Sequence, residues 1–271
     1  MNTHGKNTVE YRIEINPRFA SQALLQRLER GDGIFQDPSC RVLHAGRNRL
    51  AVVRLPVGEG KHQEVAIKEF LTRGVDSVKT LFLPSKAEKA WRGALALQER
   101  GIPTPEPVAC VVRRGFLGKR ESLYLALYDE KAEEVRTLFR RLPAAELRLL
   151  VESLARHLAL CHKKGILHRD LSDGNVLVRK KGQGQFTFSL IDTNRIRVRK
   201  RWGVCARVKS LVRLGIPAAH QKLFLEAYFG DAGLSAAIWM WYRVCKQAFE
   251  QMIAIKKALR LREAARKLGL Q

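Results

Sequence analysis

This sequence lacks the features that mark membrane-spanning and secreted proteins. No apolar run approaches the roughly 18 residues that a membrane-spanning helix needs, and the apolar segment 236–241 is far too short. The first residues lack the apolar core of a secretory signal. We therefore expect a cytoplasmic protein that is either soluble or bound peripherally to a membrane surface.

Cysteine is sparse and follows no recognisable spacing. The five cysteines are Cys40, Cys110, Cys161, Cys205 and Cys245. None belongs to a C-x-x-C pair, so the sequence indicates neither a zinc site nor a disulfide framework. We interpret the cysteines as buried, reduced thiols of a cytosolic protein.

Acidic residues are also scarce. The chain has 26 Asp and Glu against 50 Lys and Arg, a formal net charge of +24. No acidic residue occurs between Asp192 and Glu226. Self-repulsion on this scale opposes compaction, so we expect the normal partner to be anionic. Nucleic acid, an anionic membrane and a phosphorylated small molecule all fit, and charge alone does not choose among them.

The hydrophobic pattern divides the chain into a β-rich part and a helical part. Strand patterns occur at 9–15, 41–44, 49–57, 64–70, 108–113 and 122–128, and helix patterns at 19–30 and 85–100. Later helix patterns cover 135–142, 144–164, 204–214, 218–229 and 235–268, around a strand–turn–strand segment at 165–198. We predict an α+β protein with an N-terminal extension (1–40), a β-rich lobe (41–130) and a mainly helical lobe (131–271).

Three short motifs occur in an informative order. Lys68 ends Val-Ala-Ile-Lys in a predicted strand, and Asp192 ends the strand Leu-Ile-Asp. Between them, Asp170 and Asn175 stand five positions apart in His-Arg-Asp-Leu-Ser-Asp-Gly-Asn. Each motif alone is better explained as a solvated strand end or a polar turn. Together, in this order, they match the kinase signature and indicate phosphoryl transfer in a bilobal, protein-kinase-like fold.

The chemistry of phosphoryl transfer assigns a role to each of these residues. The triphosphate must be held, its charge neutralised and the acceptor hydroxyl aimed in line. Lys68 is expected to bind the phosphates of ATP as a positioned cation. Asp170 is expected to accept or orient the proton of the acceptor hydroxyl. Asn175 and Asp192 offer the hard oxygen ligands that Mg²⁺ prefers.

Two further elements are expected to help bind ATP. Glu88, in the predicted helix 85–100, is the candidate to hold Lys68 in place. The glycine-rich loop of kinases is reduced here to a turn with a single glycine, Gly46, followed by Arg47. The backbone of this turn is expected to hold the phosphates. Arg47 or Arg49 either adds compensating charge or faces solvent.

At these positions the sequence resembles the lipopolysaccharide core kinases of the Kdo/WaaP family. The resemblance is carried by Ser-Lys-Ala-Glu-Lys-Ala-Trp (85–91), Arg-Gly-Ile-Pro-Thr-Pro-Glu-Pro (100–107), Gly-Ile-Leu-His-Arg-Asp-Leu (165–171) and Leu-Ile-Asp-Thr-Asn-Arg (190–195). It implies ATP and Mg²⁺ as cofactors and transfer to a sugar hydroxyl, on heptose or Kdo, at the cytoplasmic face of the inner membrane. It also implies Asp170 as catalytic base.

The sequence departs from protein kinases in ways that bear on the acceptor. Asp192 is followed by Thr-Asn rather than Phe-Gly, Ser172 stands where protein kinases usually carry lysine, and no Ala-Pro-Glu follows Asp192. These differences argue against a protein substrate. The alternatives are a kinase of another small hydroxyl compound, a Ser/Thr-type protein kinase, and a non-catalytic, basic binding module.

Two basic segments suit an anionic glycolipid or sugar acceptor. Arg195, Arg197 and Arg199 follow the expected metal ligand and are candidate acceptor-binding residues, although a solvated basic face is the alternative. The C-terminal segment combines basic residues with Trp239, Trp241 and Tyr242. Such a helix either contacts the inner membrane or places these aromatic residues in the core. We expect no specific nucleic-acid partner.

Overall fold

The computed structural model describes residues 10–46, 48–58, 60–71, 83–114, 120–182 and 184–258. They form two compact units. The first contains the described residues up to Ala94 together with Pro105–Asp129, and the second contains Leu95–Thr104 together with the described residues from Glu130 onward. Helix α3 (Lys86–Glu99) contributes residues to both units. The division into an extension and two lobes at residues 40 and 130 stays a prediction.

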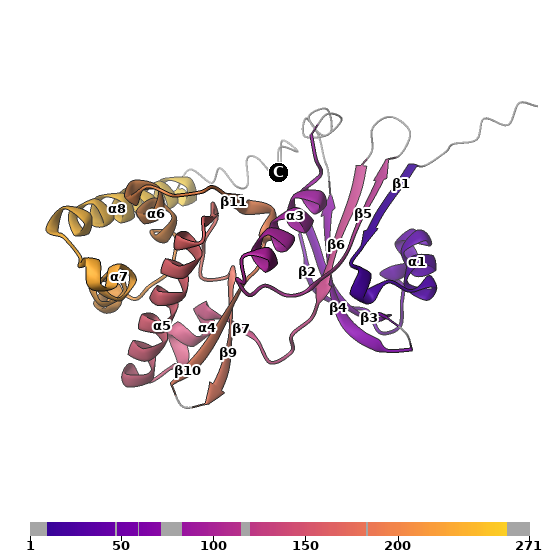
Figure 1. The fold of residues 1–271 in the computed structure, drawn as a ribbon, viewed down its shortest axis with the longest axis horizontal. Coiled ribbons are helices and arrows are strands. Elements are labelled where there is room, and N and C mark those ends of the chain that lie inside the picture. The colour runs from indigo at the N-terminus through magenta and orange to yellow at the C-terminus, as the bar shows by residue number, and fades with distance from the viewer. Residues whose placement is uncertain are drawn as a thin grey trace, which may run out of the picture. The chain divides into compact units, whose positions relative to one another are not determined.

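A six-stranded antiparallel sheet, with strand order β1-β5-β6-β4-β3-β2, organises the first unit (Figure 1). Its strands are β1 (Glu10–Ile15), β2 (Arg41–Ala45), β3 (Asn48–Pro56), β4 (His62–Leu71), β5 (Pro107–Arg114) and β6 (Arg120–Leu127). The N-terminal strand β1 pairs with β5 along its whole length, from Glu10 to Ile15. The sheet therefore includes a strand from the segment that precedes residue 40.

One face of this sheet packs against the N-terminal helical segments, which are η1 (Pro17–Phe19), α1 (Gln22–Glu29) and η2 (Gly31–Ile34). The side chain of Ser21 caps α1 by accepting a hydrogen bond from the backbone N–H of Leu24, at 3.1 Å. Leu24 then packs in one buried cluster with Val65 and Ile67 of β4. Because successive side chains on a strand point to opposite faces, Lys68 lies on the other face of the sheet.

The second unit is mainly helical. Its helices are α4 (Val135–Arg141), α5 (Ala144–Lys163), α6 (Val204–Leu211), α7 (Gln221–Phe229) and α8 (Ala236–Ala258), with short turns η4 (Thr193–Arg195), η5 (Ala218–His220) and η6 (Gly230–Ala232). A three-stranded sheet has the order β10-β9-β7, from β7 (Glu133–Glu134), β9 (Val176–Gly182) and β10 (Gln185–Leu190). β8 (Ile166–His168) pairs with β11 (Ile196–Val198).

Helix α5 is the centre of the second core. Its buried residues recur at helical spacing, as Leu147, Leu150, Val151, Leu154 and Leu158. This stripe packs in one cluster with residues of β8, β9 and β10 and of helices α6 and α7. The strands β8, β9 and β10, next to which the predicted catalytic residues lie, are thereby tied to a continuous hydrophobic core.

Most predicted elements are confirmed within a few residues. The helix patterns at 19–30, 85–100 and 144–164 correspond to α1, α3 and α5, and the pattern at 218–229 divides into η5 and α7. The pattern at 204–214 is too long, because α6 ends at Leu211. Helix α8 is described to Ala258, and the rest of the pattern at 235–268 lies outside the described residues.

The interpretation of the cysteines needs correction. Cys110 and Cys161 are buried free thiols, but Cys40 and Cys245 are only partly buried and Cys205 is exposed, so burial does not describe the whole set. The C-terminal aromatic residues also differ among themselves. Tyr242 is fully buried and stacks on Trp239 at a ring distance of 6.0 Å, whereas Trp241 is 36% exposed.

Candidate active site

Asp170 follows β8, in a loop held by hydrogen bonds to its own backbone. The N–H of Asp170 donates to Nδ1 of His168 at 3.1 Å. Its carbonyl oxygen accepts from the N–H of Ser172 at 2.8 Å and from the side-chain amide of Asn175 at 2.7 Å. These contacts use backbone atoms of Asp170, so they position its carboxylate without involving it.

His168 links this loop to the strand that carries Asp192. Its Nε2 lies 2.9 Å from the carbonyl oxygen of Ile191, which can only accept, so Nε2 carries the proton. Nδ1 is then the acceptor for the N–H of Asp170, and the ring is neutral. Burial is the main cause that lowers the pKa of His168, which is 2% exposed. The neutral form is the only one that makes both hydrogen bonds.

Asn175 and Asp192 are brought to neighbouring positions by the same frame. The N–H of Ile191 donates to the carbonyl oxygen of Asn175 at 3.1 Å. Because the amide nitrogen of Asn175 points to Asp170, its amide oxygen is left for another partner. Asp192 follows Ile191 with a left-handed backbone, φ 55° and ψ 45°, the only positive φ of a non-glycine residue in the described part of the chain. Strained backbone of this kind occurs preferentially at functional sites.

Pro103 and Thr104 belong to the 100–107 motif that carries the family resemblance, and they form hydrogen bonds with the end of β10, just before Asp192. Thr104 donates from its hydroxyl to the carbonyl oxygen of Leu190 at 2.8 Å, and the N–H of Leu190 donates to the carbonyl oxygen of Pro103 at 3.0 Å. These two bonds use both the N–H and the carbonyl oxygen of Leu190 and so fix its backbone. The motif therefore has a local structural role beside the site.

Arg213 is a site residue that sequence reasoning did not single out. Its Nη2 lies 2.5 Å from Oδ1 of Asp170. Its guanidinium lies 5.2 Å from the ring centre of Phe249 on α8, and its Nε is buried without a hydrogen-bond partner among the described residues. In the sequence Arg213 was one of many basic residues after Asp192, and no local motif distinguished it.

In the first unit, Lys68 lies on the central strand β4. It pairs in register with Leu50 of β3 and Tyr124 of β6, so its backbone is fixed on both sides. Its Nζ lies 5.4 Å from the ring centre of Phe70, on the same face of the sheet. Lys68 lies in a strand, as predicted from Val-Ala-Ile-Lys, although β4 continues to Leu71 rather than ending at Lys68.

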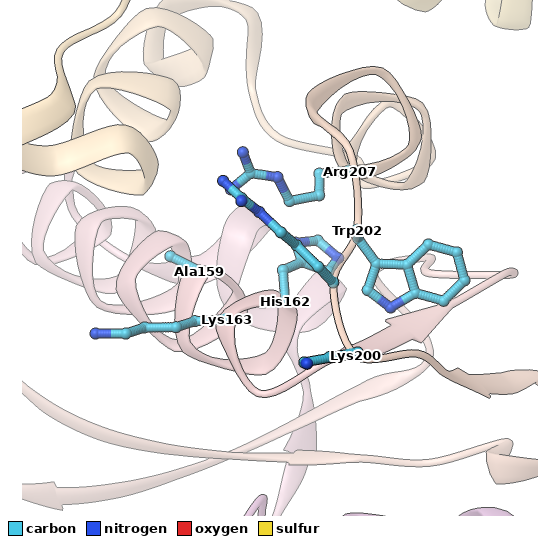
Figure 2. Close-up of a pocket in the computed structure, with 7 residues that line it drawn as sticks. Ala159, His162, Lys163, Lys200, Trp202 and Arg207 are labelled. Atoms are coloured by element: carbon cyan, nitrogen blue, oxygen red, sulfur yellow. The ribbon is translucent and has the colours of Figure 1, made fainter.

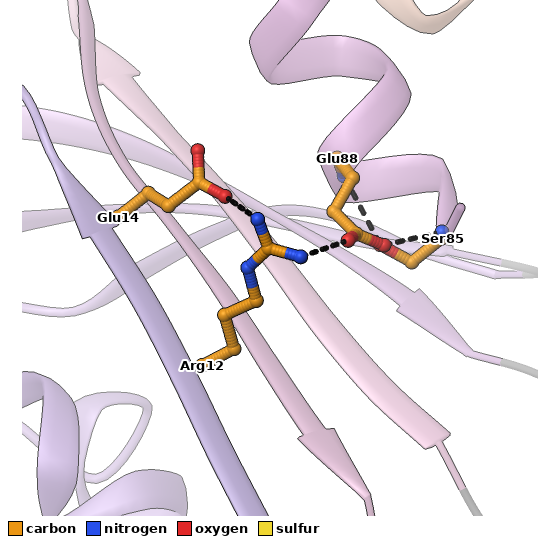
Figure 3. Close-up of polar contacts among 4 residues, drawn as sticks. All are labelled: Arg12, Glu14, Ser85 and Glu88. Atoms are coloured by element: carbon orange, nitrogen blue, oxygen red, sulfur yellow. Dashed lines mark hydrogen bonds and ion pairs between the residues drawn. The ribbon is translucent and has the colours of Figure 1, made fainter.

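Glu88 is held in the first turn of α3 (Figure 3). Its carboxylate accepts from the N–H of Ser85 at 2.6 Å, and the hydroxyl of Ser85 accepts from the N–H of Glu88 at 3.0 Å. This reciprocal pair is a capping box. Arg12 of β1 adds an ion pair at 3.5 Å to the Glu88 carboxylate. Glu88 is therefore a fixed, 6% exposed carboxylate, and its predicted role beside Lys68 stays a prediction.

The turn between β2 and β3 begins at Gly46, whose N–H donates to the carbonyl oxygen of Asn48 at 3.2 Å. Arg47 lies outside the described residues, so its expected contact with phosphate stays a prediction. Arg49 has a structural role. It forms an ion pair with the buried Glu69 at 2.7 Å, and its guanidinium lies 3.8 Å from the ring centre of Phe35. The guanidinium of Arg49 is thus engaged within the first unit, although its side chain remains 37% exposed.

The three candidate acceptor residues lie directly beside the Asp192 segment and are exposed. The N–H of Arg195 donates to the carbonyl oxygen of Asp192, and the carbonyl oxygen of Arg195 accepts from the N–H of Arg169, both at 3.1 Å. Arg197 and Arg199 continue along or just after β11, and Arg199 lies 4.7 Å from the ring centre of Trp202. Of the three, Arg195 lies nearest the Asp170 loop, whereas Arg199 lies beside Gly165 at the other end of β8.

The oxygen donors of the second unit fit a magnesium ion better than a metal held by protein alone. In the described part of the chain, no group of three or more His, Cys, Asp or Glu side chains could hold a metal. Mg²⁺ in phosphotransferases is commonly held by only one or two side-chain oxygens, with phosphate and water completing the shell. Asn175 and Asp192 supply such a pair, and the buried Oδ1 of Asn194 has no partner among the described residues.

The structure brings Asp170, Asn175 and Asp192 together in the second unit and places Lys68, Glu88 and Gly46 in the first. Among solved structures, the chain resembles one described as WaaP in complex with acyl carrier protein, with a TM-score of 0.56 and 20% sequence identity over 87% of this chain and 98% of that chain. This likeness confirms the α+β, kinase-like fold. No match was found among curated proteins.

A model of one protein family matches residues 79–224, a little over half of the chain. The matched segment contains Glu88, Asp170, Asn175, Asp192 and Arg213. The chain therefore belongs to the lipopolysaccharide kinase (Kdo/WaaP) family, and it is an ATP-dependent phosphotransferase that acts on an alcohol group.

Proposed function

We propose that this chain transfers the γ-phosphate of ATP to a hydroxyl of heptose or Kdo in the inner core of lipopolysaccharide, with Asp170 as the catalytic base. The observation that carries the proposal is the frame in which His168 and Asn175 hold the backbone of Asp170. The same frame connects to Ile191, directly before Asp192. Membership of the lipopolysaccharide kinase family supports a sugar hydroxyl as acceptor.

Asp170 removes the proton of the acceptor hydroxyl. As that proton moves to the carboxylate, the sugar oxygen forms a bond to the γ-phosphorus, and the bond between this phosphorus and the leaving oxygen of ADP breaks. Arg213 holds Oδ1 of Asp170, which leaves the second carboxylate oxygen to meet the hydroxyl. Arg213 thus places a cation beside the proposed base, in a chain that has serine at position 172 where protein kinases usually carry lysine.

Lys68 and the turn at Gly46 and Arg47 would bind the triphosphate, and Glu88 would keep Lys68 in place. Asn175 and Asp192 would hold Mg²⁺ through their side-chain oxygens. A bound Mg²⁺ supplies positive charge that neutralises the phosphate oxygens during transfer. The left-handed backbone of Asp192 and the hydrogen bond from Ile191 to Asn175 support this assignment, because they fix the two side chains on neighbouring segments.

The acceptor is proposed to be an anionic glycolipid that contacts the basic segment after Asp192. Arg195, Arg197 and Arg199 are exposed, and each can form charge-assisted hydrogen bonds to phosphate or carboxylate groups of such a molecule. β11 pairs antiparallel with β8, with Arg197 opposite Leu167, so Arg195 lies nearest the Asp170 loop and Arg199 lies at the other end of β8, beside Gly165. This arrangement supports an acceptor that approaches along β11.

A peripheral contact of α8 with the cytoplasmic face of the inner membrane is part of the proposal. None of the described helices is long and apolar enough to cross a membrane. Helix α8 nevertheless exposes apolar side chains together with basic ones, among them Met240, Val244, Ile255, Lys256 and Lys257. Helices of this composition bind at the surface of anionic bilayers.

The proposal is tested by mass spectrometry of the lipopolysaccharide core from cells with and without the protein. Loss of one phosphate from heptose or Kdo, restored by the wild-type chain but not by Asp170→Asn, is the expected result. Purified chain with labelled ATP should place the label in the glycolipid. Label in a protein or in another small hydroxyl compound, with an unchanged core, would assign the chain to a different acceptor.

A further inference from the structure

A second basic site lies in the second unit, at the end of α5 (Figure 2). It is a hollow of about 590 Å³ whose lining includes His162, Lys163, Lys200, Arg201, Trp202 and Arg207. Figure 2 shows Lys200 and Trp202 on the segment before α6, with His162 and Lys163 on α5. No residue of this lining has a role in the transfer chemistry above.

The charge around this hollow is uncompensated. Four of its lining residues are cations, and no carboxylate contributes to the lining. Within the described residues, none of these four forms an ion pair, whereas Arg49, Arg136, Lys180 and many other basic residues do. Like charges that converge without a counter-ion repel one another, and a bound anion removes that repulsion.

Close packing between Gly165 and Arg199 fixes one wall of the hollow. Gly165 has φ +77°, and a Cβ there would lie 2.0 Å from the carbonyl oxygen of Arg199. The carbonyl oxygen of Gly165 accepts from the N–H of Arg199 at 3.0 Å and from Nε1 of Trp202 at 2.8 Å. The segment that carries Lys200 and Arg201 is therefore fixed against the end of α5.

The floor of the hollow is a rigid, neutral network. The hydroxyl of Ser210 donates to the carbonyl oxygen of Arg207 at 2.7 Å, so it accepts from Nε2 of His162 at 3.2 Å. Nδ1 of His162 then accepts from the hydroxyl of Tyr228 at 2.6 Å. Nε of Arg207 is buried without a hydrogen-bond partner among the described residues. The guanidinium of Arg207 also contacts the Tyr228 hydroxyl and lies 5.9 Å from the ring centre of Phe229. The donors that remain for a ligand are those of Lys163, Lys200 and Arg201 and the rest of the Arg207 guanidinium.

The hollow is separate from the catalytic loop. Gly165 stands at one end of β8 and His168 at the other, and a strand rises about 3.3 Å per residue, so about 10 Å separate them. A ligand in the hollow therefore contacts side chains other than those of Asp170, Asn175 and Asp192.

We propose that this hollow binds the phosphate monoester group of a phosphorylated ligand. Two guanidinium groups match the oxygens of phosphate with several directed donors, and two lysines add charge. The hollow has room for a group beyond the phosphate, and the indole of Trp202 is part of its wall. The natural source is a lipid headgroup or a soluble phosphorylated compound. One candidate for the lipid source is the glycolipid acceptor itself, and that identification rests on the proposed function.

Indole NMR signals test this site directly, because the chain has only four tryptophans and Trp202 is part of the wall. Glycerol phosphate is titrated at constant ionic strength, and the signal that disappears in Trp202→Phe is followed. The variant Lys200→Glu/Arg201→Glu changes two exposed cations of the hollow. The matched control, Arg140→Glu/Lys181→Glu, makes the same charge change at exposed residues of the same unit, away from the hollow.

The expected result is a saturable shift of the Trp202 signal whose affinity falls about tenfold or more in Lys200→Glu/Arg201→Glu, since charge-assisted hydrogen bonds are lost. The control should match wild type. No saturable shift in wild type, or equal affinity in the two double variants, would overturn the proposal.

Vesicle binding identifies the source of the phosphate group. Vesicles with phosphatidic acid present a phosphate monoester, and vesicles with phosphatidylglycerol present a diester. If wild type binds phosphatidic acid vesicles more tightly than phosphatidylglycerol vesicles and Lys200→Glu/Arg201→Glu does not, the site binds a lipid headgroup. If wild type binds glycerol phosphate but shows no preference between the vesicles, the site binds a soluble ligand. Asp170→Asn separates this proposal from the proposed function. This variant should lose transfer and keep the Trp202 shift, whereas a wild-type chain that binds glycerol phosphate but does not phosphorylate the glycolipid would count against the proposed function alone.

Discussion

Replacing Asp170 with asparagine separates the chemistry of this residue from its structural contacts. The hydrogen bonds that organise the loop use the N–H and carbonyl oxygen of Asp170, and both remain in Asp170→Asn. Only the carboxylate changes, and with it the ion pair to Arg213. The variant should therefore fold normally and lose the group that accepts the proton.

The structure sets the size of both effects. The side chains of Arg213 and Asp170 are 37% and 34% exposed, so loss of their ion pair should lower the free energy of unfolding by about 1 kcal/mol at most. Removal of a general base slows transfer by about 10²- to 10⁴-fold, which corresponds to about 3–5 kcal/mol in the activation barrier. Turnover should fall far more than stability.

Three measurements on the purified chain check this expectation. Transfer is measured from labelled ATP under single-turnover conditions, stability by urea unfolding, and ATP binding by calorimetry. Binding should be near that of wild type, since the carboxylate acts on the acceptor side. Asp231→Asn, which makes the same chemical change at an exposed residue, is the control. Turnover of Asp170→Asn within about tenfold of wild type would refute the role of Asp170 as base.

Three further predictions follow from other contacts. Lys68→Met should lower kcat/KM for ATP by about 100-fold because the phosphates lose a positioned cation. The control Lys61→Met should match wild type in the same assay. Equal kcat/KM for Lys68→Met and wild type would exclude Lys68 from the site. Arg213→Ala should reduce turnover about tenfold or more with a Tm near wild type, and Arg213→Lys should recover part of it if charge beside Asp170 matters. Burial, with a smaller contribution from Arg207, lowers the pKa of His162 from 6.5 to about 3. The unfolded chain then binds more protons between these values, so unfolding free energy should fall on acidification below pH 6.5, by about 2 kcal/mol at pH 5 from this residue. Urea unfolding at pH 7 and pH 5 should show a smaller decrease in His162→Gln; an identical decrease would contradict the burial argument.

The sequence was informative wherever a property depends on neighbours along the chain. Alternating apolar residues predicted β3, β4 and β6, and helical spacing predicted α3 and α5. The capping box at Ser85 and Glu88 is likewise a local signal, formed over three residues. Short elements were the exception. β7, β8 and β11 have only two or three residues each, too few to show a period.

Contacts between segments far apart in the sequence could not be predicted from local patterns. In the sequence nothing distinguishes Arg213 from the other arginines, and only the folded chain shows its ion pair with Asp170. For Arg49 the sequence left open a role at the phosphates or a solvent-facing position, and it did not indicate the contacts with Glu69 and Phe35. Which cation meets which carboxylate depends on the tertiary path of the chain, because each charged side chain has many possible partners of similar energy.

The sequence by itself determined which chemical groups the protein has for phosphoryl transfer: a lysine on a strand, an aspartate and an asparagine in one loop, and an aspartate at a strand end. Their types and order follow directly from the chain. Only the tertiary structure decided that His168 is neutral, that Arg213 accompanies Asp170, and that Lys200, Arg201 and Arg207 surround one hollow. The physical reason is that protonation, ion pairing and cavity shape depend on burial and on distances between segments far apart in sequence.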